Sequence, residues 1–133
     1  MLQNFEHVGV TVSDLDRSLK FYCELIGMKF ILRRVSPNGG SQVAFIECAG
    51  AQLELIQPDG AIATPARRIP DTEAGVRHLT FNFDDMDATF DRLVAAGVPV
   101  VAQPRDAYNS DILARVAFVL DPDGIVIELA QRP

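Results

Sequence analysis

The two histidines of this chain and two of its glutamates are spaced as two copies of one pattern. His7 is followed 47 residues later by Glu54, and His78 is followed 50 residues later by Glu128. Two imidazoles and two carboxylates without a thiolate suit Zn, Ni, Co, Mn or Fe(II). The pattern therefore predicts one divalent metal ion held by these four side chains. The alternative is a scaffold whose polar residues only solvate a groove, because a single His or Glu on a strand is more often solvated than a ligand.

The segments around these four residues repeat as well. Residues 5–16 align with residues 76–87, and in both copies a His stands seven positions before an Asp-apolar-Asp sequence. Two later matches are Val43-Ala44-Phe45-Ile46 with Val116-Ala117-Phe118-Val119, and Leu53-Glu54-Leu55-Ile56-Gln57 with Ile127-Glu128-Leu129-Ala130-Gln131. Self-similarity over this length indicates a duplicated structural unit.

Each copy opens with a strand pattern that changes to a helix pattern. From Phe5 to Val12 polar and apolar residues alternate, and His7 lies on the face opposite the valines. Ser13 or Asp14 can cap a helix that Gly27 ends, with inward positions at Leu15, Leu19, Tyr22 and Ile26. Three strands then follow, at Lys29–Val35, Gln42–Glu47 and Ala51–Gln57.

The second copy gives the same order of elements. Its strand covers Val76–Phe83, and its helix covers Asp85–Ala96 with Met86, Phe90 and Leu93 inward. Its last strands are Val98–Gln103, Leu113–Leu120 and Gly124–Gln131. The prediction is an α+β fold of two tandem βαβββ modules, 5–57 and 76–131, in a single domain over 1–133. Their curved mixed sheets would enclose a metal-binding cavity.

The faces of the closing strands support a shared cavity. Glu54 and Glu128 each stand between two apolar residues that point to the other face of the strand. A carboxylate in such a run is costly unless it is paired, hydrogen-bonded or bound to a metal. If the two sheets face one another through their polar sides, both His and both Glu can meet at one ion.

Two connections do not fit the βαβββ scheme. Residues 58–75 contain three prolines and are either a plain linker or a cover over a site. Residues 104–112 are predicted to be a shorter loop where binding residues could sit. Four arginines in or near these segments could bind a substrate carboxylate or phosphate, although surface arginines are more often only solvated; they are Arg67, Arg68, Arg105 and Arg115.

Composition narrows the class of protein further. The chain has 133 residues and a net charge of −6, which is the wrong sign for binding nucleic acid. It contains no apolar run long enough to span a bilayer, and its first residues lack a signal-peptide pattern, so we expect no membrane partner and a cytoplasmic protein. Cys23 and Cys48 are predicted to be reduced, packed thiols.

Three stretches of the sequence resemble the vicinal oxygen chelate superfamily. They are the opening His7-Val8-Gly9-Val10, the helix start from Asp14 to Tyr22, and the final segment from Asp121 to Leu129. The resemblance covers nearly the entire chain. It implies the metal ligands of the glyoxalase I type at His7, Glu54, His78 and Glu128. In that chemistry a divalent metal stabilises an enediolate while a carboxylate carries a proton, for which we favour Glu128 with Glu54 as its partner, although the two roles could be exchanged.

The resemblance implies a lyase or isomerase of glyoxalase I (lactoylglutathione lyase) type that acts on a small oxygenated substrate. It also implies a homodimer, with Thr11 and Asn82 on the pocket wall. Where glutathione would be gripped, this sequence has Thr11 and Pro58 instead of the expected Arg and Asn, so the substrate need not be a glutathione adduct.

Three other functions of the superfamily stay open. A methylmalonyl-CoA epimerase-like isomerase gains some support from Arg67 and Arg68. A drug- or metabolite-binding resistance-type protein would use the same groove without turnover. An Fe(II) dioxygenase is disfavoured by the fourth ligand at Glu54.

Overall fold

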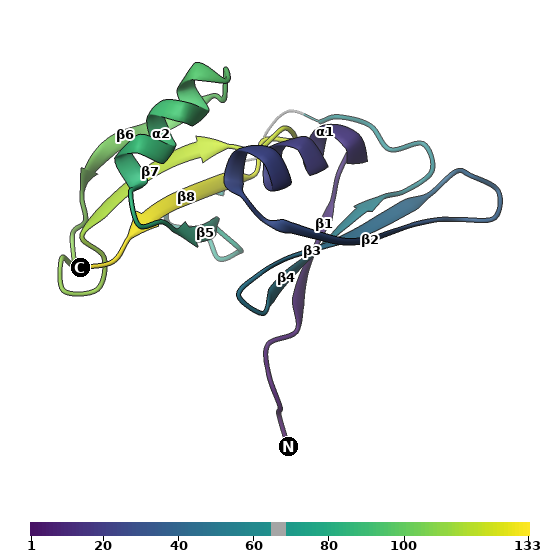
Figure 1. The fold of residues 1–133 in the computed structure, drawn as a ribbon, viewed down its shortest axis with the longest axis horizontal. Helices are drawn as coiled ribbons and strands as arrows, with labels where there is room; N and C mark the ends of the chain where they lie inside the picture. The colour runs from purple at the N-terminus through teal and green to yellow at the C-terminus, as the bar shows by residue number, and fades with distance from the viewer. Residues whose placement is uncertain (65–68) are drawn as a thin grey trace. The chain divides into compact units, whose positions relative to one another are not determined.

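The chain folds into two compact units with the same order of elements. The computed structural model describes residues 1–64 and 69–133, and the units cover Met1–Thr64 and Pro65–Pro133. Within the described residues each unit has one helical segment and one four-stranded mixed sheet, drawn purple to blue in the first unit and green to yellow in the second (Figure 1). This confirms the predicted α+β fold of two tandem βαβββ modules.

In the first unit, the strands of His7 and Glu54 are direct neighbours. The sheet order is β1-β4-β3-β2, in which β1 is parallel to β4 and the other pairs are antiparallel. Val10 and Val12 are buried while His7 and Gly9 are exposed, so the predicted alternation is confirmed. The elements of this unit are β1 (His7–Thr11), α1 (Leu15–Leu19), η1 (Lys20–Ile26), β2 (Lys29–Val35), β3 (Gln42–Cys48) and β4 (Ala51–Gln57).

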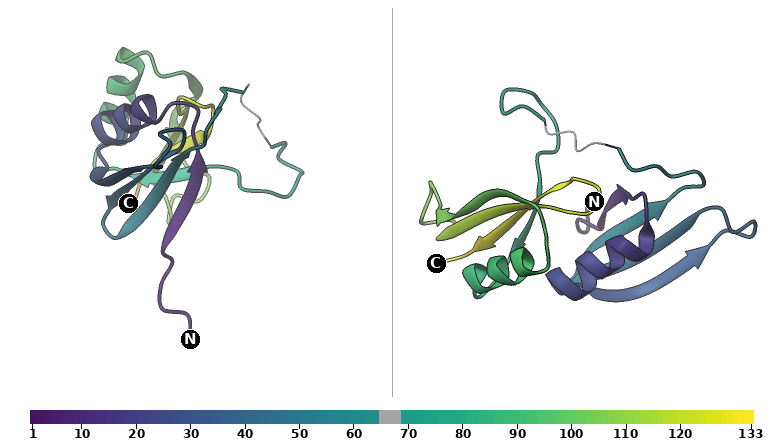
Figure 2. Two further views of the ribbon diagram at one scale, coloured as in Figure 1. Left: turned by 90° about the vertical axis from the view of Figure 1, so that its right-hand side faces the viewer. Right: turned by 90° about the horizontal axis from the view of Figure 1, so that it is seen from above.

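The second unit repeats this topology with the order β5-β8-β7-β6, in which β5 is parallel to β8. Its helix packs on one face of the sheet, against β7 and β8 (Figure 2). The predicted inward residues Met86, Phe90 and Leu93 are all buried. The elements of this unit are β5 (Leu79–Asn82), α2 (Met86–Ala95), β6 (Val100–Asp106), β7 (Arg115–Leu120) and β8 (Val126–Gln131).

The first helical segment is not the regular α-helix that its apolar spacing predicts. α1 gives way at Lys20 to a π-helix, η1, in which hydrogen bonds span five residues, as the amide of Gly27 shows by donating to the carbonyl of Tyr22. The wider turn lets the consecutive residues Phe21 and Tyr22 both become buried, with their ring centroids 5.0 Å apart. Leu19, predicted to face inward, is only half-buried.

Several strand boundaries also differ from the sequence prediction by one to three residues, and two of these differences bear on predicted site residues. β5 begins at Leu79, so His78 lies directly before the strand and not inside it. β6 continues to Asp106, which places Pro104 and Arg105 in a strand that was predicted to have ended. A proline is tolerated there because β6 is an edge strand, and the β6–β7 register shifts between Ala102 and Arg105.

The cysteines are both free, but the prediction of two packed thiols is wrong for Cys48. This residue is exposed at the end of β3, directly before the turn at Ala49 and Gly50. Cys23 is half-buried in η1, and its burial raises the pKa of the thiol.

A glutamine at the end of each closing strand holds the start of each helix. Asp14 and Asp85 are the N-caps, whose carboxylates accept amide hydrogen bonds from the first turn. In addition, the side-chain oxygen of Gln57 accepts from the first amide of α1 at 2.7 Å, and that of Gln131 accepts from the first amide of α2 at 3.1 Å. The repeated glutamines therefore join the helix to the strand that carries the repeated glutamate.

Each unit has its own apolar core between the helix and the sheet. The fully buried side chains belong to strand residues on the helix-facing side and to the inner helix positions, among them Val12, Leu15, Tyr22, Ile46 and Leu55 in the first unit and Met86, Leu93, Val119, Ile127 and Leu129 in the second. In the described part of the chain, no helix is long and apolar enough to cross a membrane.

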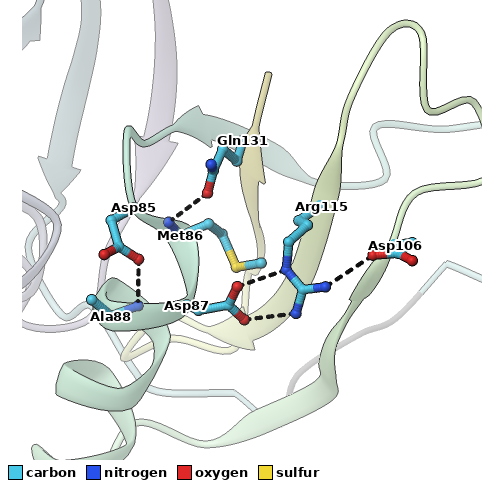
Figure 3. A network of polar contacts seen from close by, with 7 residues as sticks. All are labelled: Asp85, Met86, Asp87, Ala88, Asp106, Arg115 and Gln131. Atoms are coloured by element: carbon cyan, nitrogen blue, oxygen red, sulfur yellow. Dashed lines mark hydrogen bonds and ion pairs between the residues drawn. The ribbon is translucent and has the colours of Figure 1, made fainter. Parts of the chain in front are cut away.

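Arg115 ties the second helix to two strands of its sheet (Figure 3). Its Nε and Nη2 donate to the two carboxylate oxygens of Asp87 at 2.6 and 2.8 Å, and its Nη1 donates to Asp106 at 2.9 Å. The first unit has a comparable contact, because Arg33 on β2 donates to Asp16 of α1 at 2.6 Å. Arg115, which the sequence offered as a substrate residue, is thus engaged in holding α2 on β7.

We expect this contact to give the second unit an acid-sensitive contribution to stability. The hydrogen bonds from Arg115 lower the pKa of Asp87 from its ordinary value of 3.8. A carboxyl whose folded-state pKa is depressed stabilises the fold above its unfolded-state pKa and loses that contribution as the pH falls through the folded-state value. Arg115→Gln should therefore lower the melting temperature by a few degrees at pH 6, and the difference from the unmodified protein should shrink below about pH 4.

Thermal unfolding followed by circular dichroism at several pH values checks this expectation. Arg34→Gln is the matched control, because Arg34 is exposed and donates only to the neighbouring carbonyl of Arg33 among the described contacts. A constant difference between Arg115→Gln and the unmodified protein from pH 3 to pH 7 would contradict the assignment to Asp87.

Candidate metal-binding half sites

The first half site joins the start of β1 to the middle of β4. His7 Nε2 lies 3.3 Å from Glu54 Oε2, and the two side chains are 34% and 27% exposed. The parallel register pairs Gly9 with Glu54, which brings His7 and Glu54 to the same face of the sheet. The ring of Phe45, on β3 opposite Glu54, meets the imidazole edge-on with centroids 5.5 Å apart.

The other ring nitrogen of His7 is held by its neighbour. Nδ1 of His7 contacts the Glu6 carboxylate, and this hydrogen bond is the largest cause of a raised pKa of His7; partial burial opposes it, and the charges of Glu6 and Glu54 add to it. A carboxylate on one imidazole nitrogen fixes the ring orientation and directs the other nitrogen outward. Nε2 is thereby left facing Glu54.

The second half site has the same construction. His78 Nε2 lies 3.1 Å from Glu128 Oε2, with side chains 27% and 12% exposed. The ring of Phe118, on β7 opposite Glu128, meets the His78 imidazole with centroids 5.7 Å apart. Phe45 and Phe118 were visible in the sequence as part of the repeat, but their packing against the two histidines was not predicted.

The two half sites differ in what lies beside the carboxylate. Thr80 on β5 pairs in register with Glu128, and its hydroxyl donates to Glu128 Oε2 at 2.7 Å. The equivalent residue in the first unit is Gly9, and a Cβ added there would stand 3.7 Å from Glu54 Oε2. An alignment of the two copies would have shown this difference, because the residue two positions after the histidine is Gly9 in the first copy and Thr80 in the second.

The spacing within each pair suits two ligands of one ion. Two donor atoms that are each about 2.1 Å from a metal, and about 90 to 110° apart, lie about 3.0 to 3.4 Å from each other. The separations of 3.3 and 3.1 Å fall in this interval. Among the described residues no group of three or more His, Cys, Asp or Glu side chains is arranged to hold a metal ion, so each unit offers two donors of a set.

A pocket lies beside Glu128 within the second unit. It has a volume of about 230 Å³, and its wall combines one cation and one amide with apolar side chains: Arg105, Asn109, Ile112, Leu113 and Val116. The Arg105 guanidinium is exposed and donates to the carbonyl of Asp106 at 3.2 Å. Arg105, predicted to contact substrate, therefore stands at the same pocket as a candidate catalytic carboxylate.

The other predicted substrate residues have different surroundings. Thr11 is exposed on β1, on the face of His7 and Gly9. Asn82 is exposed at the end of β5, and its side-chain oxygen accepts from the Arg132 amide at 3.1 Å, so part of its hydrogen-bonding capacity is already used. Arg67 and Arg68 lie outside the described residues.

Comparison with known proteins identifies the family. The model of the glyoxalase/bleomycin resistance protein/dioxygenase superfamily matches residues 4–129. The chain belongs to this superfamily.

Individual relatives agree with this assignment. A probable lactoylglutathione lyase of Synechocystis sp. is 33% identical over 129 residues, which cover 94% of this chain and 92% of that protein. The crystal structure of glyoxalase I from Zea mays matches with a TM-score of 0.77 at 27% identity, over 96% of this chain and 44% of that chain. An antibiotic-binding protein from Streptomyces sp. CB03234 matches with a TM-score of 0.71 at 25% identity, over 99% and 98% of the two chains.

Proposed function

We propose that this protein is a divalent-metal-dependent lyase or isomerase of glyoxalase I type, in which His7, Glu54, His78 and Glu128 together hold one ion. The observation that carries the proposal is the repeated pair of a His Nε2 and a Glu Oε2 at 3.3 and 3.1 Å, at equivalent positions of two equivalent sheets. Relatives named as lactoylglutathione lyases support the reaction class.

The donor set fits a divalent cation of the first transition row. Two imidazoles and two carboxylates suit Zn, Ni, Co, Mn or Fe(II). When bound, such an ion supplies Lewis-acid stabilisation of negative charge on neighbouring substrate oxygens. Glu6 on Nδ1 of His7 gives one imidazole the outer support that metal-binding histidines usually have.

One of the two carboxylates, that of Glu54 or that of Glu128, acts first as the general base and then as the general acid. It takes the proton from a carbon that bears a hydroxyl and lies next to a carbonyl, and the electron pair of the broken C–H bond forms a C=C bond as negative charge moves onto the carbonyl oxygen. The resulting carboxylic acid returns the proton to the former carbonyl carbon, and the hydroxyl proton moves to the oxygen on that carbon, so the isomerisation needs no oxidant or reductant. Such positioned proton transfer typically contributes about 10²- to 10⁴-fold in rate.

The pocket beside Glu128 indicates a small substrate with an anionic group. Arg105 can pair with a carboxylate or phosphate, and Asn109 can add a hydrogen bond. Ile112, Leu113 and Val116 give the same pocket an apolar side. The substrate class is therefore a small oxygenated compound with an acidic group and a short apolar part.

The proposal includes a homodimer. Phe30 and Val35 are exposed on β2, an edge strand of the first sheet, and two further large apolar side chains, Phe5 and Val76, are also exposed. Exposed apolar residues on a strand edge are typical of surfaces that pair with another chain.

Metal titration of the chelator-treated protein tests the proposal. We expect one Ni²⁺, Zn²⁺ or Co²⁺ per chain, light scattering at twice the 14.6 kDa chain mass, and metal-dependent conversion of the methylglyoxal adduct of glutathione or of mercaptoacetate. Mercaptoacetate supplies the carboxylate that Arg105 would pair with. Two independent weak sites per chain, or none, would overturn the shared site.

A second candidate is a module that binds a drug or metabolite without turning it over. The apolar side of the 230 Å³ pocket and the similarity to an antibiotic-binding protein favour it. This function predicts ligand binding that is indifferent to chelators. Ligand affinity that survives treatment with a chelator, together with conversion of neither adduct, would favour this candidate.

A further inference from the structure

Each sheet carries an arginine on its edge strand, on the face that holds the half site. In the first unit, Arg34 of β2 pairs in register with Val43, and in the second unit, Arg105 of β6 pairs with Val116. The two valines are equivalent residues of the sequence repeat, so the two arginines occupy equivalent positions of the two sheets. The sequence patterns singled out Arg105 as a substrate residue, but not Arg34.

The arginine of the first unit lies one row of side chains away from the glutamate of that unit. Arg34, Val43 and Ile56 form one row across β2, β3 and β4. Ile56 follows Glu54 by two residues on β4, so their side chains point to the same face of the sheet. A Cβ added at Gly9 would stand 3.7 Å from Glu54 Oε2 and 3.9 Å from Ile56 Cδ1, which places both side chains beside the half site.

In the second unit, the same arrangement forms part of a pocket wall. Arg105, Val116 and Ala130 form the equivalent row across β6, β7 and β8, and Ala130 follows Glu128 by two residues. Arg105, Val116 and Glu128 all line the pocket of about 230 Å³. An arginine at this position of the sheet thus shares a pocket with the glutamate of its unit, and the first unit places an arginine and a glutamate in the same relation.

Neither arginine is paired with a carboxylate among the described residues. Nη1 of Arg34 donates to the carbonyl of Arg33 at 2.9 Å, and Nη1 of Arg105 donates to the carbonyl of Asp106 at 3.2 Å. By contrast, Arg33 and Arg115 reach carboxylates of the two helices. The remaining donors of an exposed guanidinium form a planar fork that fits a carboxylate or a phosphate. Both arginines are therefore available to an acidic group of a ligand.

We infer that Arg34 is a second anion-binding, specificity-determining residue, and that the substrate carries two acidic groups, one paired with Arg34 and one with Arg105. This inference rests on the proposed function, in which both half sites serve one ion. The row between Arg34 and β1 is apolar at Val43 and Ile56, which are half-buried. The substrate class is therefore a small oxygenated compound with two acidic groups and a short apolar part between them.

Binding of simple dicarboxylates to the full-length protein tests the inference without turnover. The probes are succinate, glutarate and adipate, whose carboxylates are separated by different lengths of chain, so the test does not depend on one separation of Arg34 and Arg105. Butyrate, with one carboxylate, is the comparison ligand. In calorimetric titrations we expect at least one dicarboxylate to bind at least about tenfold more tightly than butyrate, because hydrogen bonds between charged groups typically contribute that much. Phosphonopropionate, compared with succinate, shows which kind of acid is preferred.

Three variants assign the second carboxylate to its partner. Arg34→Gln should remove the preference for the dicarboxylate and leave the affinity for butyrate within about twofold. Arg105→Gln should remove the preference as well. Lys20→Gln is the matched control, because it removes the same charge from an exposed position of η1 in the same unit and should keep the preference. A preference that persists in Arg34→Gln would overturn the inference.

Turnover gives a second readout. The methylglyoxal adduct of mercaptosuccinate has two carboxylates, whereas that of mercaptoacetate has one. Arg34→Gln should raise KM for the mercaptosuccinate adduct at least about tenfold at an unchanged kcat, since a contact away from the reacting carbons contributes equally to ground-state and transition-state binding. The same variant should change KM for the mercaptoacetate adduct less than about twofold. Equal losses with both adducts would indicate a structural role and overturn the inference.

The outcomes separate this inference from the proposed function. If no dicarboxylate binds more tightly than butyrate, the inference fails, while the metal site and the reaction class stand. If the unmodified protein holds no metal and converts neither adduct, the proposed function fails, although a dicarboxylate preference that depends on Arg34 would still identify this arginine as an anion-binding residue. Melting temperatures of all variants identify any loss that comes from unfolding.

Discussion

His78→Ala is expected to lower the affinity for the bound divalent cation at least about 100-fold and to abolish metal-dependent turnover. The reason is that removal of a group that only orients a ligand already costs about 10- to 100-fold, and His78 supplies the ligand nitrogen itself. Glu128 Oε2, now 3.1 Å from the imidazole, would lose its neighbour in the donor pair. Metal analysis after dialysis and titration with a chromophoric chelator measure the loss.

Two further variants distinguish the loss of a metal ligand from other effects on metal binding. Glu6→Gln changes the group that orients His7, so we expect a smaller loss, about 10-fold. Glu47→Ala is the matched control, because Glu47 is a strand glutamate of the first unit whose described partner is Lys29 at 3.6 Å, and its removal should leave metal binding unchanged. Full occupancy at the original affinity in His78→Ala would contradict the four-ligand site.

Periodicity predicted the elements well wherever one face of an element is buried. The alternation from His7 to Val12 and the inward residues of α2 are confirmed. Burial of one face of an element requires apolar residues at a regular spacing, and that spacing is visible in the sequence. The first helix departs from its prediction at Phe21, where two adjacent aromatic residues are buried. A regular α-helix with 3.6 residues per turn does not place two adjacent residues on one narrow buried face. The π-helical turn allows both of these aromatic residues to be buried.

Strand ends were less predictable because tertiary pairing decides them. β6 runs through Pro104 since its outer edge needs no partner, and the sequence signals of that segment are those of a loop. The exposed position of Cys48 likewise depends on where β3 turns, at Ala49 and Gly50.

The repeat predicted which residues of the half sites matter, but not all of their partners. His7 with Glu54, and His78 with Glu128, are brought together within their units as the strand pattern implies. The contact of Thr80 with Glu128 depends on the parallel register of β5 and β8, which no local pattern specifies. Differences between the two copies carry as much information on the chemistry as their similarities do.

Leu129→Ala is expected to destabilise the second unit by about 3 kcal/mol, within the range of about 2 to 5 kcal/mol for truncation of a buried leucine. Leu129 is fully buried on β8, where it pairs with Phe81 on one side and Ala117 on the other. The loss combines the transfer of apolar atoms with the cavity that stays behind. Val94→Ala, on the exposed side of α2, is the control and should change stability by less than about 0.5 kcal/mol.

Metal should offset most of this loss if the neighbouring Glu128 is a ligand. A ligand present at about 100 times its dissociation constant stabilises the folded state by about 2.7 kcal/mol, provided that it does not bind the unfolded chain. Urea unfolding of Leu129→Ala with and without Co²⁺ measures the recovery. The same ion should give little recovery in Leu129→Ala combined with His78→Ala, because the donor pair is then incomplete. Equal recovery in both proteins would show that the ion stabilises the fold from elsewhere, and a loss below about 1 kcal/mol in Leu129→Ala would show that β8 does not anchor the core that supports Glu128.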